Sequence, residues 1–89
     1  MPYKIVLSKK YKQNYKKANK KDRILIDEVV EKLSNDEILE SKYKDHALNG
    51  NYIGFRECHI KPDLLLVYRK IDEVLELYLA NLGNHNSIF

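Results

Sequence analysis

The second half of the chain limits the fold most strongly, because three runs of strand-forming residues follow one another with very short connections. The runs cover residues 52–60, 64–70 and 74–81 and are rich in Leu, Val, Ile and Tyr. The connections at 61–63 and 71–73 are too short for a crossover between parallel strands, so we expect antiparallel neighbours. A small sheet is stable only when another layer packs on it, so the first half must supply that layer.

The first half predicts one strand and two helices. Residues 3–7 are rich in β-formers and predict a first strand. Ser8 can cap a helix over 9–18, in which tyrosines share one side and lysines cover the rest. Apolar residues then recur at helical spacing over 25–34, after a weak capping box that begins at Asn19, and this pattern predicts a second helix.

The order strand, helix, helix, strand, strand, strand predicts a two-layer α+β domain. We expect an antiparallel sheet with the two N-terminal helices packed on one face, which leaves the other face partly open. Residues 35–51 show no clear period and predict a long surface loop, of a length that is often functional. The break at Gly83 ends the last strand and leaves a short polar tail.

Composition sets the scale of the molecule. The chain has 89 residues, of which 44% are hydrophobic and 33% charged, and this predicts one folded domain over 1–89 with a thin core that a partner helps to stabilise. Its one cysteine, Cys58, cannot form an internal disulfide, and no uncharged stretch approaches the ~20 residues of a membrane span. Nothing like a signal peptide opens the chain, so we expect a reducing, cytoplasmic setting and no membrane partner.

The net charge of +3 conceals a strong asymmetry between the two parts of the chain. Residues 1–23 hold nine Lys and Arg against one Asp, a sum of +8, while residues 24–89 hold seven Lys and Arg against twelve Asp and Glu, a sum of −5. Such a basic segment is typical of a phosphate-backbone binder, although a lysine-rich helix face also serves solubility alone. The lysines of this segment that we expect to bind nucleic acid are Lys9, Lys10, Lys12, Lys16, Lys17, Lys20 and Lys21.

Three histidines, His46, His59 and His85, are the candidates for proton transfer, because the unperturbed pKa of histidine, ~6.5, lies near neutrality. Each of them taken singly also fits a surface or hydrogen-bonded structural role. Asp63 follows Pro62 in a predicted turn, where an aspartate is also a common turn-former. The cations that can pair with phosphate are Arg56, Lys61 and Lys44, and these can equally balance the nearby Glu57, Asp63 and Asp45.

Metal binding and nucleophilic catalysis are competing interpretations of the same residues. Three histidines and an aspartate can in principle form a metal site, but the sequence has no His-x-x-x-His pair and Cys58 has no partner cysteine. Cys58 lies at an apolar position within a predicted strand, and Ser87 lacks the setting of a nucleophile elbow. We therefore expect no bound metal and no cofactor.

Three motifs, taken in order, resemble one known family. KDHALNG at 44–50, FRECHIKPDLLLVY at 55–68 and LGNHNSIF at 82–89 are similar to the YafQ branch of the RelE/ParE toxin superfamily, and the strand-helix-helix start fits its RelE-like fold. The resemblance implies a bacterial type II toxin that enters the ribosomal A site and cuts mRNA. It also implies a cognate antitoxin as partner, with operator DNA bound only through the complex of the two proteins.

The resemblance assigns catalytic positions residue by residue. The family's functional positions fall on His46, His59, Asp63, His85 and Phe89. Close relatives often place an arginine where this chain has Asn81, and the position after the aspartate, often aromatic, is Leu64. The missing arginine would remove positive charge that offsets the developing phosphorane, and we expect Arg56 or Lys61 to replace it.

The chemistry of RNA agrees with these assignments. RNA contains its own nucleophile, the 2′-OH, so cleavage needs a base, an acid and a nearby cation but no metal. Two alternatives remain open at this point. One is a ParE-like or decayed toxin that acts by binding a target, which the loss at Asn81 favours, and the other is a metal-dependent nuclease.

Overall fold

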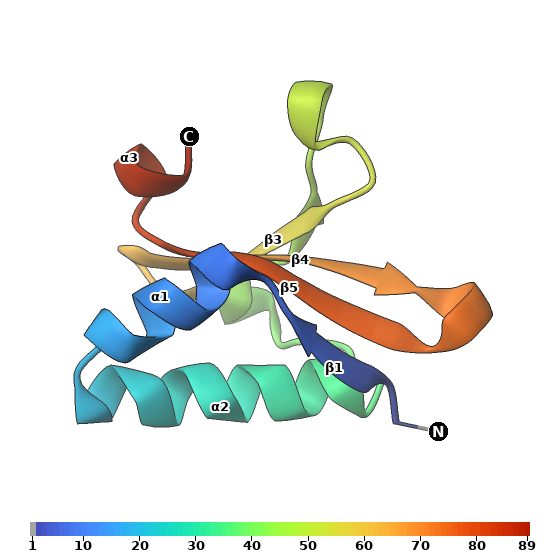
Figure 1. Ribbon diagram of the computed structural model, residues 1–89, viewed down its shortest axis with the longest axis horizontal. Helices are drawn as coiled ribbons and strands as arrows, with labels where there is room; N and C mark the ends of the chain where they lie inside the picture. The colour runs from blue at the N-terminus through green and yellow to red at the C-terminus, as the bar shows by residue number, and fades with distance from the viewer. Residues whose placement is uncertain (1) are drawn as a thin grey trace.

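Three helices and five strands form along residues 2–89, which are the residues described by the computed structural model (Figure 1). The helices are α1 (Lys9–Lys17), α2 (Lys20–Ser34) and α3 (His85–Ile88). The strands are β1 (Lys4–Leu7), β2 (His46–Ala47), β3 (Arg56–Lys61), β4 (Leu64–Ile71) and β5 (Glu76–Gly83). Single 3-10 turns lie at Ser41–Tyr43, Gly50–Tyr52 and Asp72–Val74.

All five strands form one sheet in the order β1-β5-β4-β3-β2. The pairs β2–β3, β3–β4 and β4–β5 are antiparallel, as the short connections predict, whereas β1 runs parallel to β5 at the edge. The helix α2 lies along one face of this sheet, and α3 lies beyond the other face (Figure 1). The predicted α+β class and the antiparallel arrangement of the last three strands are confirmed.

Capping side chains define where the two long helices begin. The Ser8 hydroxyl accepts a hydrogen bond from the Tyr11 amide at 3.0 Å, and the Asn19 side chain accepts one from the Asp22 amide at 2.8 Å. On α1 the ring of Tyr11 is buried, while the lysines point to solvent. None of the helices described, of which α2 is the longest with 15 residues, is long and apolar enough to cross a membrane.

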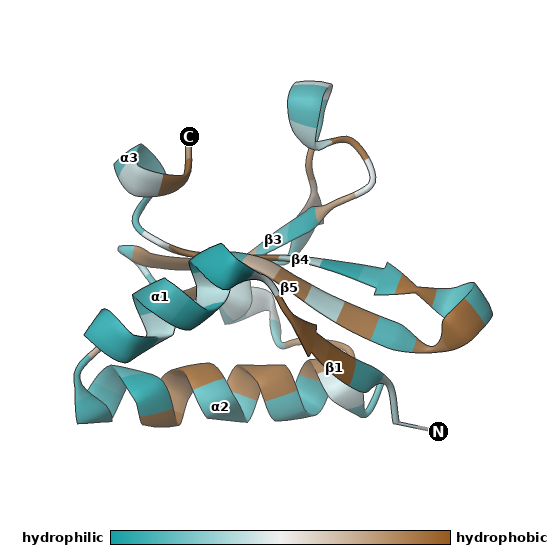
Figure 2. Cartoon of the chain, in the orientation of Figure 1, coloured by the Kyte–Doolittle hydropathy of each residue, from teal (hydrophilic) through white to brown (hydrophobic). Residues whose placement is uncertain are grey.

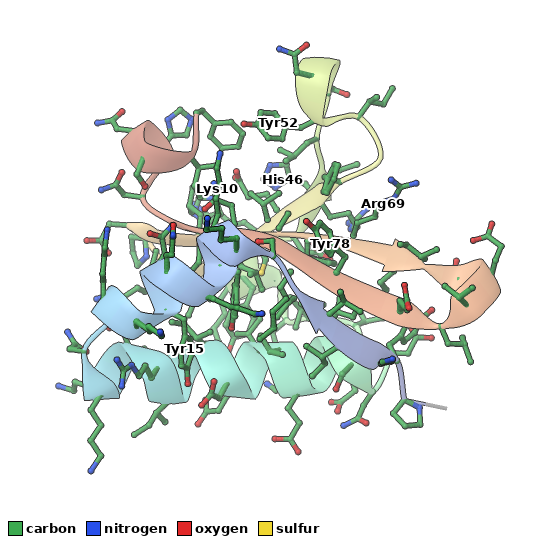
Figure 3. The ribbon with its side chains drawn as sticks, in the orientation of Figure 1. Lys10, Tyr15, His46, Tyr52, Arg69 and Tyr78 are labelled. Atoms are coloured by element: carbon green, nitrogen blue, oxygen red, sulfur yellow. The ribbon has the colours of Figure 1, made fainter. Side chains whose placement is uncertain are left out.

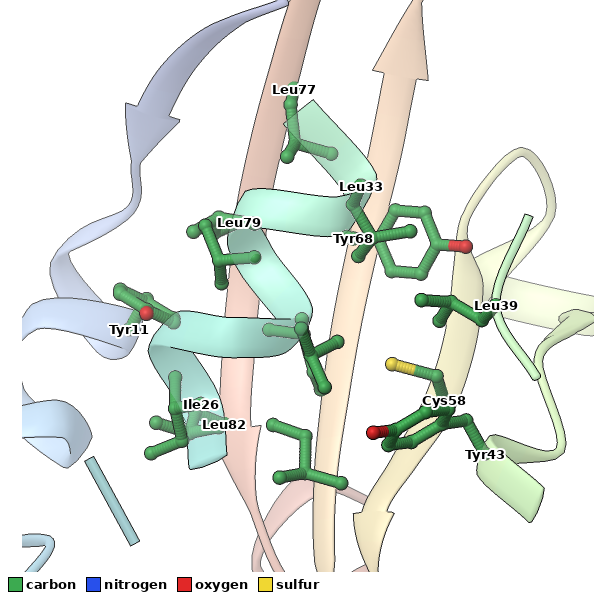
Figure 4. Close-up of a cluster of buried hydrophobic side chains, with 14 residues drawn as sticks. Tyr11, Ile26, Leu33, Leu39, Tyr43, Cys58, Tyr68, Leu77, Leu79 and Leu82 are labelled. Atoms are coloured by element: carbon green, nitrogen blue, oxygen red, sulfur yellow. The ribbon is translucent and has the colours of Figure 1, made fainter. Parts of the chain in front are cut away.

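The main core lies between α2 and the sheet (Figures 2 and 4). It contains Ile26 and Leu33 from α2 and Leu66, Leu77 and Leu79 from the sheet, each no more than 1% exposed. A smaller cluster of Leu65, Val67 and Ile88 lies on the opposite face, with Leu48, Phe55 and Ala80 packed against it. The expected open face is therefore covered in part, by α3 and by the segment before β3.

Two expected strand starts differ from the structure by two residues or more, and both differences have a local cause. The strand expected from Tyr52 begins only at Arg56, because residues 50–55 form a turn in which the Phe55 amide donates to the Tyr52 carbonyl at 3.0 Å. The strand expected from Val74 begins at Glu76, because Leu75 adopts a positive φ of 51° after the 3-10 turn. The expected loop over 35–51 contains β2 and one 3-10 turn.

Candidate active site

Two histidines converge on one buried glutamate at the β2–β3 edge of the sheet. His46 lies directly opposite Glu57 in the antiparallel pair, so their side chains share a face, and His59 is two residues further along β3 on that same face. The Nε2 atoms of His46 and His59 lie 3.5 Å and 3.6 Å from Glu57 Oε1. The ring centroids of the two histidines are 6.4 Å apart. These three side chains, His46, Glu57 and His59, form the histidine–glutamate cluster.

Glu57 is the buried member of this cluster. Glu57 is 5% exposed, and within residues 2–89 its Oε2 atom has no hydrogen-bond partner. The two imidazoles face its other oxygen atom, Oε1. His46 Nδ1 lies 2.6 Å from the carbonyl oxygen of Lys44, and because a carbonyl only accepts, Nδ1 donates there. These contacts on both ring nitrogens orient the His46 ring.

A second group of rings lies around the C-terminal segment, on the side of the sheet where α3 lies. The rings of His85 and Phe89 are 5.1 Å apart, and Tyr52 meets Phe89 edge to face at 5.1 Å. The Tyr52 hydroxyl also donates to the Ile88 carbonyl at 3.2 Å. Figure 3 shows Tyr52 and His46 on this side of the sheet. Tyr52 therefore joins the 3-10 turn before β3 to the end of the chain, where His85 is exposed to solvent.

Gly83 allows the chain to turn from β5 into α3. Its φ is +157°, and a Cβ at this position would approach Ser87 Oγ to 2.5 Å. After the turn, the Asn84 side chain accepts a hydrogen bond from the Ser87 amide at 2.8 Å and caps the short helix. Ile88 then packs against Leu65 and Val67. These contacts fix the position of the segment that contains His85 and Phe89.

Asp63 lies apart from these contacts. It is exposed in the turn between β3 and β4, and among residues 2–89 no ion pair or hydrogen bond joins it to a histidine. The carboxylate that contacts His59 is Glu57. The predicted role of Asp63 in orienting an imidazole therefore stays a prediction.

The three predicted phosphate ligands lie in different surroundings. Arg56 alternates with Glu57 and points to the other side of β3, where its Nε lies 3.3 Å from Asp45, which also accepts from the buried Tyr68 hydroxyl at 2.6 Å. Lys61 Nζ lies 3.0 Å from Asp22 on α2, and this hydrogen bond raises the pKa of Lys61. Lys44 is exposed, and its backbone adopts a positive φ of 49°.

The predicted basic segment forms an exposed surface. The seven lysines predicted to bind nucleic acid all lie at solvent-exposed positions, on α1 and on the first residues of α2. The hydropathy colouring shows α1 as almost entirely hydrophilic on its visible side (Figure 2).

The remaining candidates are the Cys58 thiol as a nucleophile and a metal site built from His, Cys, Asp or Glu. Burial raises the pKa of the Cys58 thiol to about 12, so the thiol is neutral near neutral pH and a poor nucleophile. Within residues 2–89 no group of three or more His, Cys, Asp or Glu side chains, the histidine–glutamate cluster included, is arranged to hold a metal ion.

Comparison with known proteins identifies the family. Residues 3–89 match the family described as "Bacterial toxin of type II toxin-antitoxin system, YafQ". The chain belongs to the YafQ toxin family. It is 33% identical over 88 residues to the mRNA interferase toxin YafQ of Escherichia coli K12, with 96% of this chain and 94% of that protein covered.

Solved structures agree with the YafQ assignment across the whole fold. A metal-bound toxin from Helicobacter pylori is 43% identical, with a TM-score of 0.89 over 98% of this chain and 99% of that one. YafQ in the E. coli DinJ-YafQ toxin-antitoxin complex is 29% identical, with a TM-score of 0.86 over 100% of this chain and 99% of that one. The resemblance inferred from the three sequence motifs is confirmed.

The two departures from the YafQ pattern have clear positions. Asn81, at the position where an arginine is expected, has its side-chain oxygen bonded to Asn14 of α1 at 3.1 Å and to the Leu82 amide at 2.8 Å. Leu64 packs against the main core. Asn81 therefore joins β5 to α1.

Two residues that contact the candidate site residues were not predicted as part of the site. Glu57 contacts His46 and His59, and Tyr52 contacts Phe89. Strand alternation could have found Glu57, because residues 57 and 59 share a face of β3. The role of Tyr52 depends on a contact across the fold that no local pattern indicates.

Proposed function

We propose that this YafQ-family toxin is a metal-independent endoribonuclease that cuts mRNA on the ribosome, with histidines as acid and base. The observation that carries the proposal is the histidine–glutamate cluster on the side of the sheet where the segment with His85 and Phe89 is docked. Both histidines of the cluster are at least partly accessible, with 49% of the His46 side chain and 28% of the His59 side chain exposed. An RNA phosphate can therefore reach them.

The reaction uses the 2′-OH of the RNA as nucleophile. A base removes the 2′-OH proton, the oxygen attacks the adjacent phosphorus, and an acid protonates the departing 5′-oxygen. The products are a 2′,3′-cyclic phosphate and a 5′-hydroxyl. His59 and His85 share these two proton transfers, while His46, held by Lys44 and Glu57, positions the RNA.

The remaining residues position the RNA. The half-exposed Phe89 ring offers a stacking surface for an RNA base. The proposed cations that attract phosphates of the RNA strand are Lys44, Lys61 and Arg56. Asp63, exposed in its turn, stays the proposed partner of an imidazole once RNA is bound. Because the nucleophile belongs to the RNA, no metal-activated water is needed and no cofactor is proposed.

The partners follow from the charge of the surface. The seven exposed lysines bind ribosomal RNA phosphates, and the ribosome restrains the mRNA that so small a domain cannot restrain alone. An acidic cognate antitoxin covers the same surface and stabilises the fold by mass action, and operator DNA is bound only through that complex. Because ribosomes and mRNA are its proposed targets, the proposed location is the cytoplasm.

The test of the catalytic assignment is mRNA cleavage on purified ribosomes by folded single variants. Because each proton-transfer group is worth roughly 10²–10⁴ in rate, His59→Ala and His85→Ala should lose activity to that extent and still bind the antitoxin. His46→Ala should cost less. Full cleavage by both His59→Ala and His85→Ala would show that these residues are not the acid and base.

A chelator separates this proposal from a metal-dependent nuclease. Cleavage should continue in EDTA, and its loss with recovery on metal addition would contradict metal independence. The comparison matters because a similar toxin is described as metal-bound.

A second candidate function is inhibition of a target by binding without cleavage. It is favoured by Asn81, which is uncharged where an arginine is expected and bonds to Asn14 of α1. In that case the protein arrests its target by binding alone. Mapping mRNA 5′ ends after brief expression distinguishes the two, since a binder leaves no new 5′-hydroxyl ends.

A further inference from the structure

A pocket of about 450 Å³ lies at the end of β3, between α2 and the 3-10 turn at 41–43. This volume is within the roughly 300–1,000 Å³ typical of ligand pockets. Its apolar wall comes from Leu25, Tyr43, Ile60 and Pro62. The wall is built from elements of the rigid scaffold, because Ile60 and Tyr43 are 7% and 9% exposed and belong to the main core.

Cations form the rest of the pocket. Lys42, Lys44 and Lys61 line it together with His59. Lys61 is paired with Asp22, whereas no ion pair to Lys42 or Lys44 exists in the described chain. Lys42 Nζ instead lies 5.1 Å from the centre of the Tyr43 ring. Two ammonium groups are therefore available to an anion that enters beside the apolar wall.

His59 joins this pocket to the proposed active site. Its ring contacts Glu57 in the histidine–glutamate cluster, and the same residue forms part of the pocket lining. A molecule that occupies both the histidine–glutamate cluster and this pocket needs an anionic group at the cluster and near the lysines. It also needs an adjoining apolar group that fits the pocket wall. A nucleotide meets this requirement, since its base has apolar faces and its phosphate is an anion.

We propose that this pocket binds one nucleotide of the RNA, next to the cleaved bond, with the base against Leu25, Ile60 and Pro62 and the phosphate near Lys42 and Lys44. The inference rests on the proposed function, which supplies RNA as the substrate. It adds a nucleotide subsite, which makes Leu25 a residue that affects sequence preference.

Titration of the isotope-labelled protein with the four 5′-mononucleotides, followed by NMR, tests the subsite directly. Saturable shifts are expected at the methyl groups of Leu25 and Ile60, whereas inorganic phosphate at equal ionic strength should leave these methyl groups unchanged. Leu25→Glu places a like charge beside the phosphate and should weaken nucleotide binding at least tenfold.

Ile24→Glu is the matched control. Ile24 is the neighbouring residue on α2, is 52% exposed and does not line the pocket, so the same change of charge there should leave nucleotide affinity as in the wild type. Circular dichroism melting checks that both variants are folded. On ribosomes, Leu25→Glu should raise KM or change the preferred base at mapped cleavage sites, and Ile24→Glu should do neither.

The outcomes separate this subsite from the proposed function. If the wild type cuts no mRNA but binds nucleotides in a Leu25-dependent way, the nuclease proposal fails and the pocket stands. If mRNA is cut and the two variants behave alike, the pocket assignment is wrong. The pocket assignment is also wrong if the methyl signals of Leu25 and Ile60 do not shift with nucleotides, or shift equally with inorganic phosphate. It is likewise wrong if an acidic antitoxin segment protects the pocket and nucleotides do not.

Discussion

The two faces of the sheet bury very different amounts of apolar surface. On the helix side, α2 and the sheet enclose most of the core, with side chains such as Ile26 and Leu66 fully buried. On the other side the buried apolar side chains among residues 2–89 are Leu65, Val67 and Ile88, and the histidine–glutamate cluster, with its buried Glu57, lies at the edge of the same face. Stability is therefore concentrated on the first face and ionisable chemistry on the second.

This division has a physical reason in so short a chain. One core must supply nearly all of the favourable burial, because a domain of this size hides only about 60–65% of its unfolded surface. Groups that exchange protons with a large substrate must instead stay accessible, and α3 covers the second face with a few contacts only. The cost is that Glu57 is buried with one oxygen atom unpartnered among residues 2–89.

The largest effect is expected from adjacent leucines that point to opposite faces of β4. Leu66 is fully buried in the main core and Leu65 is 2% exposed in the small cluster. Leu66→Ala should cost about 3–5 kcal/mol of unfolding free energy and Leu65→Ala about 2 kcal/mol, because the smaller cluster can collapse around the cavity. Urea denaturation measures both values. Equal losses would show that the two faces contribute alike.

The same pair should reverse its order in activity. Leu65 supports Ile88, and therefore the position of the segment with His85, so Leu65→Ala should slow mRNA cleavage by more than Leu66→Ala at temperatures where both are folded. A greater loss in Leu66→Ala would contradict the assignment of chemistry to the second face.

The next effect concerns the buried charge. Glu57→Gln removes the carboxylate that faces two imidazoles, and a loss of cleavage of up to about 10²-fold is expected from misplacement of the histidines. The unfolding free energy should change by less than about 1 kcal/mol, since an incompletely paired buried charge is itself costly. Glu73→Gln is the control, because Glu73 is exposed. If Glu57→Gln loses as much unfolding free energy as Leu66→Ala, Glu57 is mainly structural.

Much of the fold could be predicted because local patterns and packing agree. The helix over 25–34 and the strand over 64–70 have apolar residues at the spacing that the sheet requires, and Ser8 and Asn19 cap the helices as expected. The parallel pairing of β1 with β5 and the docking of α3 depend on contacts between distant segments. No spacing in the sequence indicates those contacts.

The site could be predicted in residue type more than in arrangement. The histidines were found because few residues titrate near neutrality, and the structure brings His46 and His59 together through Glu57. Arg56 was grouped with them from its place in the sequence, but strand alternation turns it toward Asp45 on the other side. The joining role of Tyr52 requires the C-terminal segment to fold back, which is a property of the whole fold.

A smaller effect should follow from one hydrogen bond. Tyr52→Phe keeps the edge-to-face contact with Phe89 and removes the bond to the Ile88 carbonyl, which is worth about 1 kcal/mol. Hydrogen exchange at the amides of α3 should become faster while the amides of β4 keep their protection. Equal acceleration in β4 and α3 would show that the two faces open together.

The smallest effect should come from Cys58, on the stable face beneath the site. Burial raises the pKa of this thiol from 9.0 to about 12, so the folded state resists its ionisation. A raised folded-state pKa means that this contribution to stability is complete below pH ~9 and is lost as the pH rises from there toward 12. The unfolding free energy of the wild type should therefore fall faster above pH 9 than that of Cys58→Ala, with the tyrosines common to both chains. Iodoacetamide at pH 8 should modify the unfolded chain and spare the folded one. Rapid modification of the folded protein would show that the helix-side core opens as readily as the face with the histidine–glutamate cluster.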